Sequence, residues 1–299
     1  MALPTRLSGS PLGICLGNQF ERCEIDNLPL VSITIPSYNS EKMIPFCLEG
    51  VAKQTYPNIE TLVIDSHSTD RTRDIAASYQ ARVVLCDGKL LAARYLGLQE
   101  SKGPYVVLVD TDQILEPTAI ERAAGMMDDY DMVVFETLSH NTEWFIPKLH
   151  GALKQLMNAR FEKPGAFDPT RGPFLPRFFK REILEKAFAA IPQELIPDTI
   201  DPDHAIIYYE SYKVSQRVGG LRNAIYDIEP DWRKLWETRY RYAASLRSVK
   251  KSYYGNQLLK EIGSAPCFGR PLGAGFQTLL LAVIIKVIDW MGYCFGRVS

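Results

Sequence analysis

The sequence has little that would indicate a zinc site, a nucleic-acid-binding surface or a disordered chain. Its six cysteines are scattered without the close pairs that zinc sites use, so we expect free thiols in a reducing compartment. The 34 Lys and Arg residues balance 35 Asp and Glu, so the overall charge gives no reason to expect a nucleic-acid partner. No repeat or low-complexity segment is present, and 46% of the residues are hydrophobic. A globular protein with a sizeable core is therefore predicted.

The sequence also lacks a recognisable secretory signal. Residues 1–27 contain only short apolar stretches interrupted by Pro, Gly and polar residues. We interpret this segment as a tail or loosely docked arm, and we expect the protein to be cytoplasmic.

Long hydrophobic runs are missing as well. The longest strictly apolar run near the C-terminus is "LLLAVII", Leu279–Ile285, whereas a membrane-spanning helix needs about 20 mostly apolar residues. Lys286 and Asp289 follow directly and would be costly inside a bilayer, so a single-span anchor is disfavoured. Two alternatives remain: a buried closing helix or oligomer contact, and an interfacial helix peripheral to the cytoplasmic face of the cell membrane. The residues that favour the interfacial helix are the basic Arg247, Lys250, Lys251 and Lys260 and the aromatic Trp290, Tyr293 and Phe295.

Apolar strand patterns alternate with helical patterns through the first half of the chain. "LVSITIPSYN", "IETLVIDSHSTD", "ARVVLCD" and "PYVVLVDTD" are predicted strands with helices between them, and "DMVVFET" is a further strand. This rhythm is typical of an α/β fold with a mostly parallel central sheet flanked by helices. We expect this sheet in a domain of residues 28–225, followed by a helical, membrane-associating extension of residues 226–299.

Polar residues stand where the predicted strands end, and such sheets bind ligands beyond the carboxyl ends of their strands. The most conspicuous pair is Asp110 and Asp112 in "VVLVDTD". Because carboxylates repel one another and are expensive to bury, this pair indicates either a solvated turn or a cation site.

The motifs "VSITIPSYNS", "QTYPNIETLVIDSHSTDRT", "ARYLGL" and "VVLVDTD" occur in the order seen in family 2 glycosyltransferases, which the chain resembles. The resemblance is strong over Leu30–Glu116 and traceable to about Gly220. It implies the glycosyltransferase A fold and inverting transfer of a sugar from a nucleotide-diphosphate sugar to an acceptor hydroxyl or phosphate.

The resemblance also implies roles for individual residues. "DTD" matches the family's Asp-any-Asp motif, so Asp110 and Asp112 would hold Mg²⁺ or Mn²⁺ on the donor diphosphate, with Asp112 the more direct ligand and Asp110 nearer the ribose. The residues expected to bind the nucleotide sugar begin with Pro36, Tyr38, Asn39 and Asp65 at the base and ribose. Lys89 and Arg94 are expected to contact the diphosphate or Asp110, and Arg177 is expected to face the acceptor or the diphosphate. Arg171 and the "DWRK" segment are weaker candidates of the same kind, and an ordinary basic surface explains each of them equally well.

The chain departs from the family pattern at two points. The glycine that usually follows the second strand's aspartate is absent from "DSHSTD", where Ser66 and His67 stand. The family's Glu-Asp pair before a later helix corresponds here to "PDTIDPDH", in which Pro202 replaces the first acid and Asp203 aligns with the second. Asp203 is therefore the expected catalytic base, with Asp201 in reserve, unless these acids form only a solvated turn that caps the helix.

Two other functions compete with a glycosyltransferase. A sugar nucleotidyltransferase would need a glycine-rich, basic loop after the first strand, which "IPSYNSEKM" does not provide. A non-catalytic module that binds nucleotide sugars or a partner at the membrane remains the alternative. If the C-terminal segment does attach to a membrane, the expected acceptor is a lipid-linked glycan or a polyprenyl phosphate.

Overall fold

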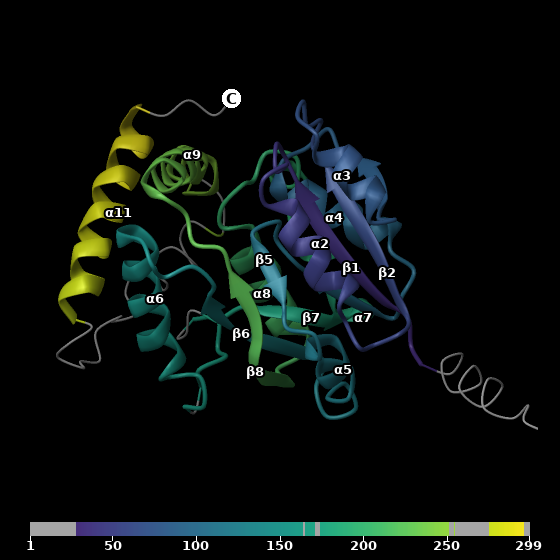
Figure 1. The fold of residues 1–299 in the computed structure, drawn as a ribbon. Helices are drawn as coiled ribbons and strands as arrows, with labels where there is room; N and C mark the ends of the chain where they lie inside the picture. The colour runs from purple at the N-terminus through teal and green to yellow at the C-terminus, as the bar shows by residue number, and fades with distance from the viewer. Residues whose placement is uncertain (1–27, 164, 171–173, 251–253, 255–274, 296–299) are drawn as a thin grey trace, which may run out of the picture.

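The computed structural model describes residues 28–163, 165–170, 174–250, Tyr254 and 275–295 (Figure 1). The predicted N-terminal arm of residues 1–27 lies outside this part of the chain, as do Arg171, Lys251 and Lys260 and the side chains of Arg247 and Lys250.

The described residues form one mixed sheet of eight strands in the order β3-β2-β1-β4-β7-β6-β8-β5. The first half is parallel and consists of the predicted strands β1 (Val31–Ser37), β2 (Ile59–Asp65), β3 (Arg82–Leu85) and β4 (Tyr105–Leu108). The second half contains β5 (Gln113–Leu115), β6 (Met132–Ser139), β7 (Pro176–Lys180) and β8 (Val218–Asp227). There β7 is antiparallel to β4 and β6, while β8 is parallel to β6 and antiparallel to β5. The expected α/β sheet is confirmed.

Helices cover both faces of this sheet. One core includes residues of α2 (Ile44–Ala52), α3 (Thr72–Ser78) and α5 (Ala119–Ala124). A second core, on the other face, includes α4 (Leu90–Glu100), α7 (Arg181–Ala190) and α8 (Asp203–Val214), with a short 3₁₀ helix at Gln193–Leu195. Three further helices lie together at one side of the molecule in Figure 1: α6 (Phe145–Asn158), α9 (Trp232–Lys250) and α11 (Gly275–Phe295).

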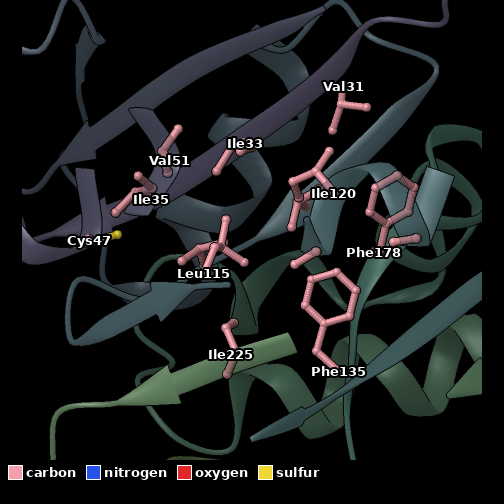
Figure 2. Packing of buried hydrophobic residues seen from close by; sticks show 14 of the residues in the cluster. Val31, Ile33, Ile35, Cys47, Val51, Leu115, Ile120, Phe135, Phe178 and Ile225 are labelled. Atoms are coloured by element: carbon pink, nitrogen blue, oxygen red, sulfur yellow. The ribbon is translucent and has the colours of Figure 1, made fainter. Parts of the chain in front are cut away.

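Strand β1 shows how the sequence pattern builds these layers. Val31, Ile33 and Ile35 alternate along β1 and are fully buried in the first core, where Figure 2 shows them near residues of α2, β5 and α5. The residues between them face the other way. A Cβ on Gly97 of α4 would lie 3.1 Å from the Thr34 Cβ, so glycine lets α4 pack closely on this face. This close packing fixes the helix that carries Arg94.

Three strands were not expected from the sequence: β7, β8 and the short β5, which follows the acids at the end of the fourth predicted strand. The stretch that contains β7 reads as irregular, and residues 205–219 read as one helix, whereas α8 ends at Val214 and β8 begins at Val218. Strand β7 is stabilised by pairing with β4 and β6, and β8 by pairing with β6 and β5. These partners are distant in the sequence, so local patterns carry little sign of either strand. Strand β8 continues to Asp227, two residues past the predicted domain boundary.

The C-terminal helix α11 packs on α9 and α6. Its buried Leu281 and Ile288 belong to a small core with Leu235 of α9 and with Ile146 and Leu149 of α6. Arg239 of α9 also forms a salt bridge to Asp289, with Nε donating to Oδ1 at 2.9 Å. Among the described residues, one helical stretch, Thr278–Phe295, is long enough and apolar enough to cross a membrane. Of this stretch, 22% is buried inside the protein.

Candidate active site

The carboxylate of Asp110 is held by two arginines at the end of β4. Arg94 of α4 donates from Nη2 to Oδ1 at 2.6 Å, and Arg177 of β7 donates from Nη1 to Oδ2 at 2.9 Å. Burial alone would raise the pKa of Asp110, but the two guanidinium groups hold it well below its usual range. Asp110 is therefore a carboxylate anion that links the loop after β4 to helix α4 and strand β7.

Arg94 also bonds to the predicted base. Its Nε donates to Oδ2 of Asp203, the first residue of α8. Arg94 is only 1% exposed and Asp203 only 6%. Burial raises the pKa of Asp203, and the nearby Arg94 charge offsets this only in part. The Nη1 atom of Arg94 is buried without a hydrogen-bond partner in the described structure. The Arg94 guanidinium thus bonds to both Asp110 and Asp203, and its Nη1 remains an unused donor.

His204 lies beside this arrangement. Its Nε2 is 2.9 Å from Nη1 of Arg177, and because a guanidinium can only donate, the imidazole accepts. Burial and the charges of Arg94 and Arg177 keep the pKa of His204 well below its ordinary value. His204 is therefore neutral, with its proton on Nδ1.

Asp112 differs from Asp110 because its side chain is exposed. The structure gives it no hydrogen bond or salt bridge from another described side chain. The protein atoms around it, together with the charges of Asp110 and Asp227, raise the pKa of Asp112 to about 7. A carboxylate crowded by like charges is one that a cation would stabilise.

A chain of hydrogen bonds positions the backbone of Asp110. Lys154 of α6 donates to Asp227 Oδ2 at 2.6 Å, and Gln113 Nε2 donates to Asp227 Oδ1 at 3.1 Å. Gln113 Oε1 in turn accepts from the backbone N–H of Asp110 at 3.0 Å. Lys154, Asp227 and Gln113 were not predicted from the sequence, since the pairing of β5 with β8 brings Gln113 beside Asp227 and the packing of α6 adds Lys154.

The donor set can be tested against the expected divalent metal. Among the described residues, no group of three or more His, Cys, Asp and Glu side chains forms a metal cluster. Mg²⁺ in phosphate-binding sites is commonly held by one or two carboxylates plus phosphate oxygens and water, so such a cluster is not required. Asp112, exposed and crowded by other acids, fits this role, with Asp110 beside it.

The reserve base Asp201 lies two residues before Asp203 in the chain and is half-buried. Burial and the charge of Asp203 raise its pKa to about 6. Burial and the charges of Asp203 and Asp110 raise the pKa of the Tyr242 phenol, so this residue of α9 lies within electrostatic range of the same acids. Nothing in the local sequence around Tyr242 had indicated that α9 reaches the site.

The predicted nucleoside end lies at the carboxyl ends of β1 and β2. Asp65 is fully buried and accepts from Ser37 Oγ at 2.9 Å and from Ser68 N at 2.8 Å. It therefore ties the two strand-end loops together. Tyr38, which is 53% exposed, and Asn39 offer the accessible groups, whereas Pro36 is buried within β1.

The backbone at His67 adopts a conformation that favours glycine, although the chain has histidine there. His67 has a φ of 57°, in the left-handed region where glycine is the least strained residue. Its imidazole pairs with Asp87 across the next strand end, with Nε2 2.7 Å from Oδ1. Lys89 stands immediately before α4, where its backbone N–H donates to Pro197 O at 2.8 Å.

Comparisons with known proteins agree on the family. The model of "Glycosyl transferase family 2" matches residues 32–188. Glycosyltransferase GlyG of Streptococcus pneumoniae is 32% identical over 34% of this chain and 36% of its own length. EpsJ of Bacillus subtilis, an uncharacterized glycosyltransferase, is 23% identical over 76% of this chain and 68% of its own length. The chain thus spans about a third of GlyG and about two thirds of EpsJ.

Solved structures give the same fold. Staphylococcus aureus TarS 1-349 in complex with UDP-GlcNAc superposes with a TM-score of 0.56 at 16% identity, covering 88% of this chain and 89% of TarS 1-349. The mannosyltransferase PcManGT from Pyrobaculum calidifontis, in complex with GDP-Man and Mn²⁺, gives 0.52 at 17% identity, covering 91% and 74%. The expected glycosyltransferase A fold is confirmed, and the protein belongs to glycosyl transferase family 2.

Proposed function

We propose that the protein is an inverting glycosyltransferase that moves a sugar from a nucleotide-diphosphate sugar to an acceptor hydroxyl or phosphate. The observation that carries the proposal is the chain of contacts from Asp110 through Arg94 to Asp203. Asp110 belongs to the motif that faces the donor diphosphate in the family, and Asp203 is the aligned base. One buried arginine links the two functions beyond the carboxyl ends of the parallel strands.

The donor is proposed to bind with its nucleoside at Tyr38 and Asn39, where an exposed ring offers a face for stacking. In this account Asp65 shapes the pocket by fixing the two loops, with Pro36 beneath them. Lys89, Arg94 and Arg177 are the cations nearest the diphosphate, and the unpartnered Nη1 of Arg94 is a donor for one of its oxygens. The TarS and PcManGT structures are complexes with UDP-GlcNAc and GDP-Man, so UDP and GDP are both candidate nucleotides.

Mg²⁺ or Mn²⁺ is the proposed cofactor, held by Asp112 and, nearby, by Asp110 together with the donor. A bound divalent cation would neutralise the charge that develops on the departing nucleoside diphosphate. PcManGT contains Mn²⁺ with its donor, which supports a metal of this kind.

Asp203 is the proposed base, with Asp201 in reserve. In an inverting transfer the acceptor O–H loses its proton to a carboxylate as its oxygen attacks the sugar from the side opposite the leaving group. Arg94 fixes the Asp203 carboxylate by donating to Oδ2. Burial raises the pKa of Asp203 towards a value suited to proton transfer.

We propose a lipid-linked glycan or polyprenyl phosphate as acceptor, with the protein peripheral on the cytoplasmic face of the cell membrane. The support is the arrangement of α9, whose Tyr242 lies near Asp203 while its Leu235 packs with the apolar helix α11. A membrane-bound acceptor would then be within reach of the site.

The experiment is a calorimetric titration with UDP- and GDP-linked sugars, with Mn²⁺ and with a chelator, followed by a transfer assay on the donor that binds. Metal-dependent binding of one donor and transfer to a lipid-phosphate acceptor are expected. Binding without transfer or hydrolysis would instead support the non-catalytic module, and no binding of any donor would refute the proposal. Asp112→Asn should remove the metal dependence, and Asp74→Asn is its matched control, since Asp74 is an exposed aspartate on α3.

A further inference from the structure

One side of α11 is apolar although it faces solvent. Leu279, Val283, Val287 and Trp290 are between 51% and 63% exposed and recur at intervals of three or four residues, so they form one stripe along the helix. The buried Leu281 and Ile288 lie on the opposite side, against α6 and α9. Helix α11 is therefore apolar on both sides, and only one of them is covered within the described protein.

The charges on α11 are arranged unequally between these sides. Asp289 is paired with Arg239 of α9. Lys286 is exposed and has no ion-pair partner among the described residues. The outward side thus carries a free cation and no free carboxylate. Trp290, with Tyr293 and Phe295 in the last turn, adds exposed aromatic rings of the type that favour the boundary between water and lipid.

The sequence around this helix is strongly basic. Residues 232–299 contain eleven Lys and Arg but only three Asp and Glu, a net charge of +8, whereas the whole chain has a net charge of −1. The remaining residues are therefore acidic overall, and the C-terminal quarter is electrostatically distinct. Such a segment is attracted to an anionic surface.

We infer that the outward stripe of α11 docks on an anionic lipid surface, with the helix axis in the plane of the membrane. The apolar stripe would enter the boundary of the acyl chains while Lys286 contacts lipid phosphates. A spanning arrangement would expose Asp289 to hydrocarbon and strip α11 from α6 and α9, so the docked inner side favours the in-plane one.

The same observations disfavour a second copy of the chain as the occupant. Two copies that met through this stripe would bring two segments of net charge +8 together, and their repulsion would oppose the contact. An anionic lipid surface satisfies both the apolar stripe and the positive charge. The inference rests on the proposed function only in that a membrane-bound acceptor gives the docking a purpose.

Vesicle flotation tests it. The full-length protein is mixed with vesicles of phosphatidylcholine alone, or of phosphatidylcholine and phosphatidylglycerol in equal parts, at low and high salt. We expect binding to the mixed vesicles that weakens with salt, and binding weaker by about tenfold or more for Val283→Glu combined with Val287→Glu. Lys286→Glu should weaken binding less, and only at low salt. Tyr79→Glu adds one negative charge at an exposed ring just after α3, a helix on the opposite side from α11 in Figure 1, and should leave binding unchanged.

Each outcome can be separated from the fate of the proposed function, because donor titration on the same samples reports whether the variants fold and bind. The inference is overturned if the wild type floats with neither vesicle, or if the double variant floats as well as the wild type. It is also overturned if the wild type is a dimer in solution that the double variant converts to monomers while neither binds vesicles. Asp112→Ala, which disables the proposed metal site, should float like the wild type.

Discussion

Arg94 on α4 donates both to Asp110 and to Asp203, a residue 109 positions later in the chain. Because Arg94 is only 1% exposed, its charge is compensated almost entirely by these two acids. Asp110 on the donor-binding side and the proposed base Asp203 thus share one buried cation. Each of the two carboxylates accepts a hydrogen bond from it.

Arg94→Met should therefore destabilise the fold by about 3–5 kcal/mol, because it leaves Asp203 buried without a cation and Asp110 with Arg177 alone. Urea unfolding measures this. Arg82→Met is the control, since its salt bridge to Glu100 is largely exposed and is worth about 0–1 kcal/mol. A loss no larger for Arg94→Met than for the control would show that the contact is unimportant for stability.

Asp112→Asn should abolish the metal dependence of donor binding without destabilising the protein. The side chain is exposed and crowded by Asp110 and Asp227, so removing its charge relieves repulsion in the metal-free state. Thermal unfolding in chelator should give an equal or higher Tm than the wild type. Mn²⁺ titration by calorimetry should lose its heat in this variant and keep it in Asp74→Asn. Unchanged Mn²⁺ affinity would exclude Asp112 as a ligand.

His150 should make stability depend on pH. Burial, with the charges of Lys154 and Arg239, lowers its pKa to about 4, whereas the unfolded chain has an ordinary histidine near 6.5. Between these values the unfolded state binds the proton and the folded state does not, so stability falls as the pH drops from about 6.5 to 4. The loss should reach about 3 kcal/mol at most, since Glu229 Oε2, 3.4 Å from Nδ1, partly favours the charged ring. His150→Gln should flatten this part of the profile. Equal slopes in the two proteins would contradict the assignment.

His67 provides a test of backbone strain. Because its φ is 57°, His67→Gly should be more stable than His67→Ala by about 1 kcal/mol, while both variants lose the same imidazole contact to Asp87. Chemical denaturation of the two variants compares them directly. The reverse order would mean that the loop adopts a different conformation in solution.

The sequence could predict the parts of this protein whose signals are local. Strands β1 to β4 are apolar runs that end in polar residues, and Asp110 follows the last of them. The family motifs named Asp110, and also Arg94 on α4 and Asp203 at the start of α8. These roles came from the resemblance to the family.

The rest depends on pairing between distant segments. Strand β8 forms on β6 and β5 and brings Asp227 beside Gln113, which no local pattern around either residue indicates. The complete burial of Asp65 was not expected either, because it results from hydrogen bonds between the loops after β1 and β2. Tyr242 reaches the site only through the packing of α9, a helix outside the family match.

The measurement that tests the central claim most directly is the kinetics of Asp203→Asn beside Asp201→Asn, with the donor identified by calorimetry. If Asp203 is the base linked to the donor site through Arg94, Asp203→Asn should lower kcat by about 100-fold or more while the donor still binds in a metal-dependent manner. Asp201→Asn should keep most of the activity. Near-normal kcat in Asp203→Asn, or a loss found only in Asp201→Asn, would contradict the account.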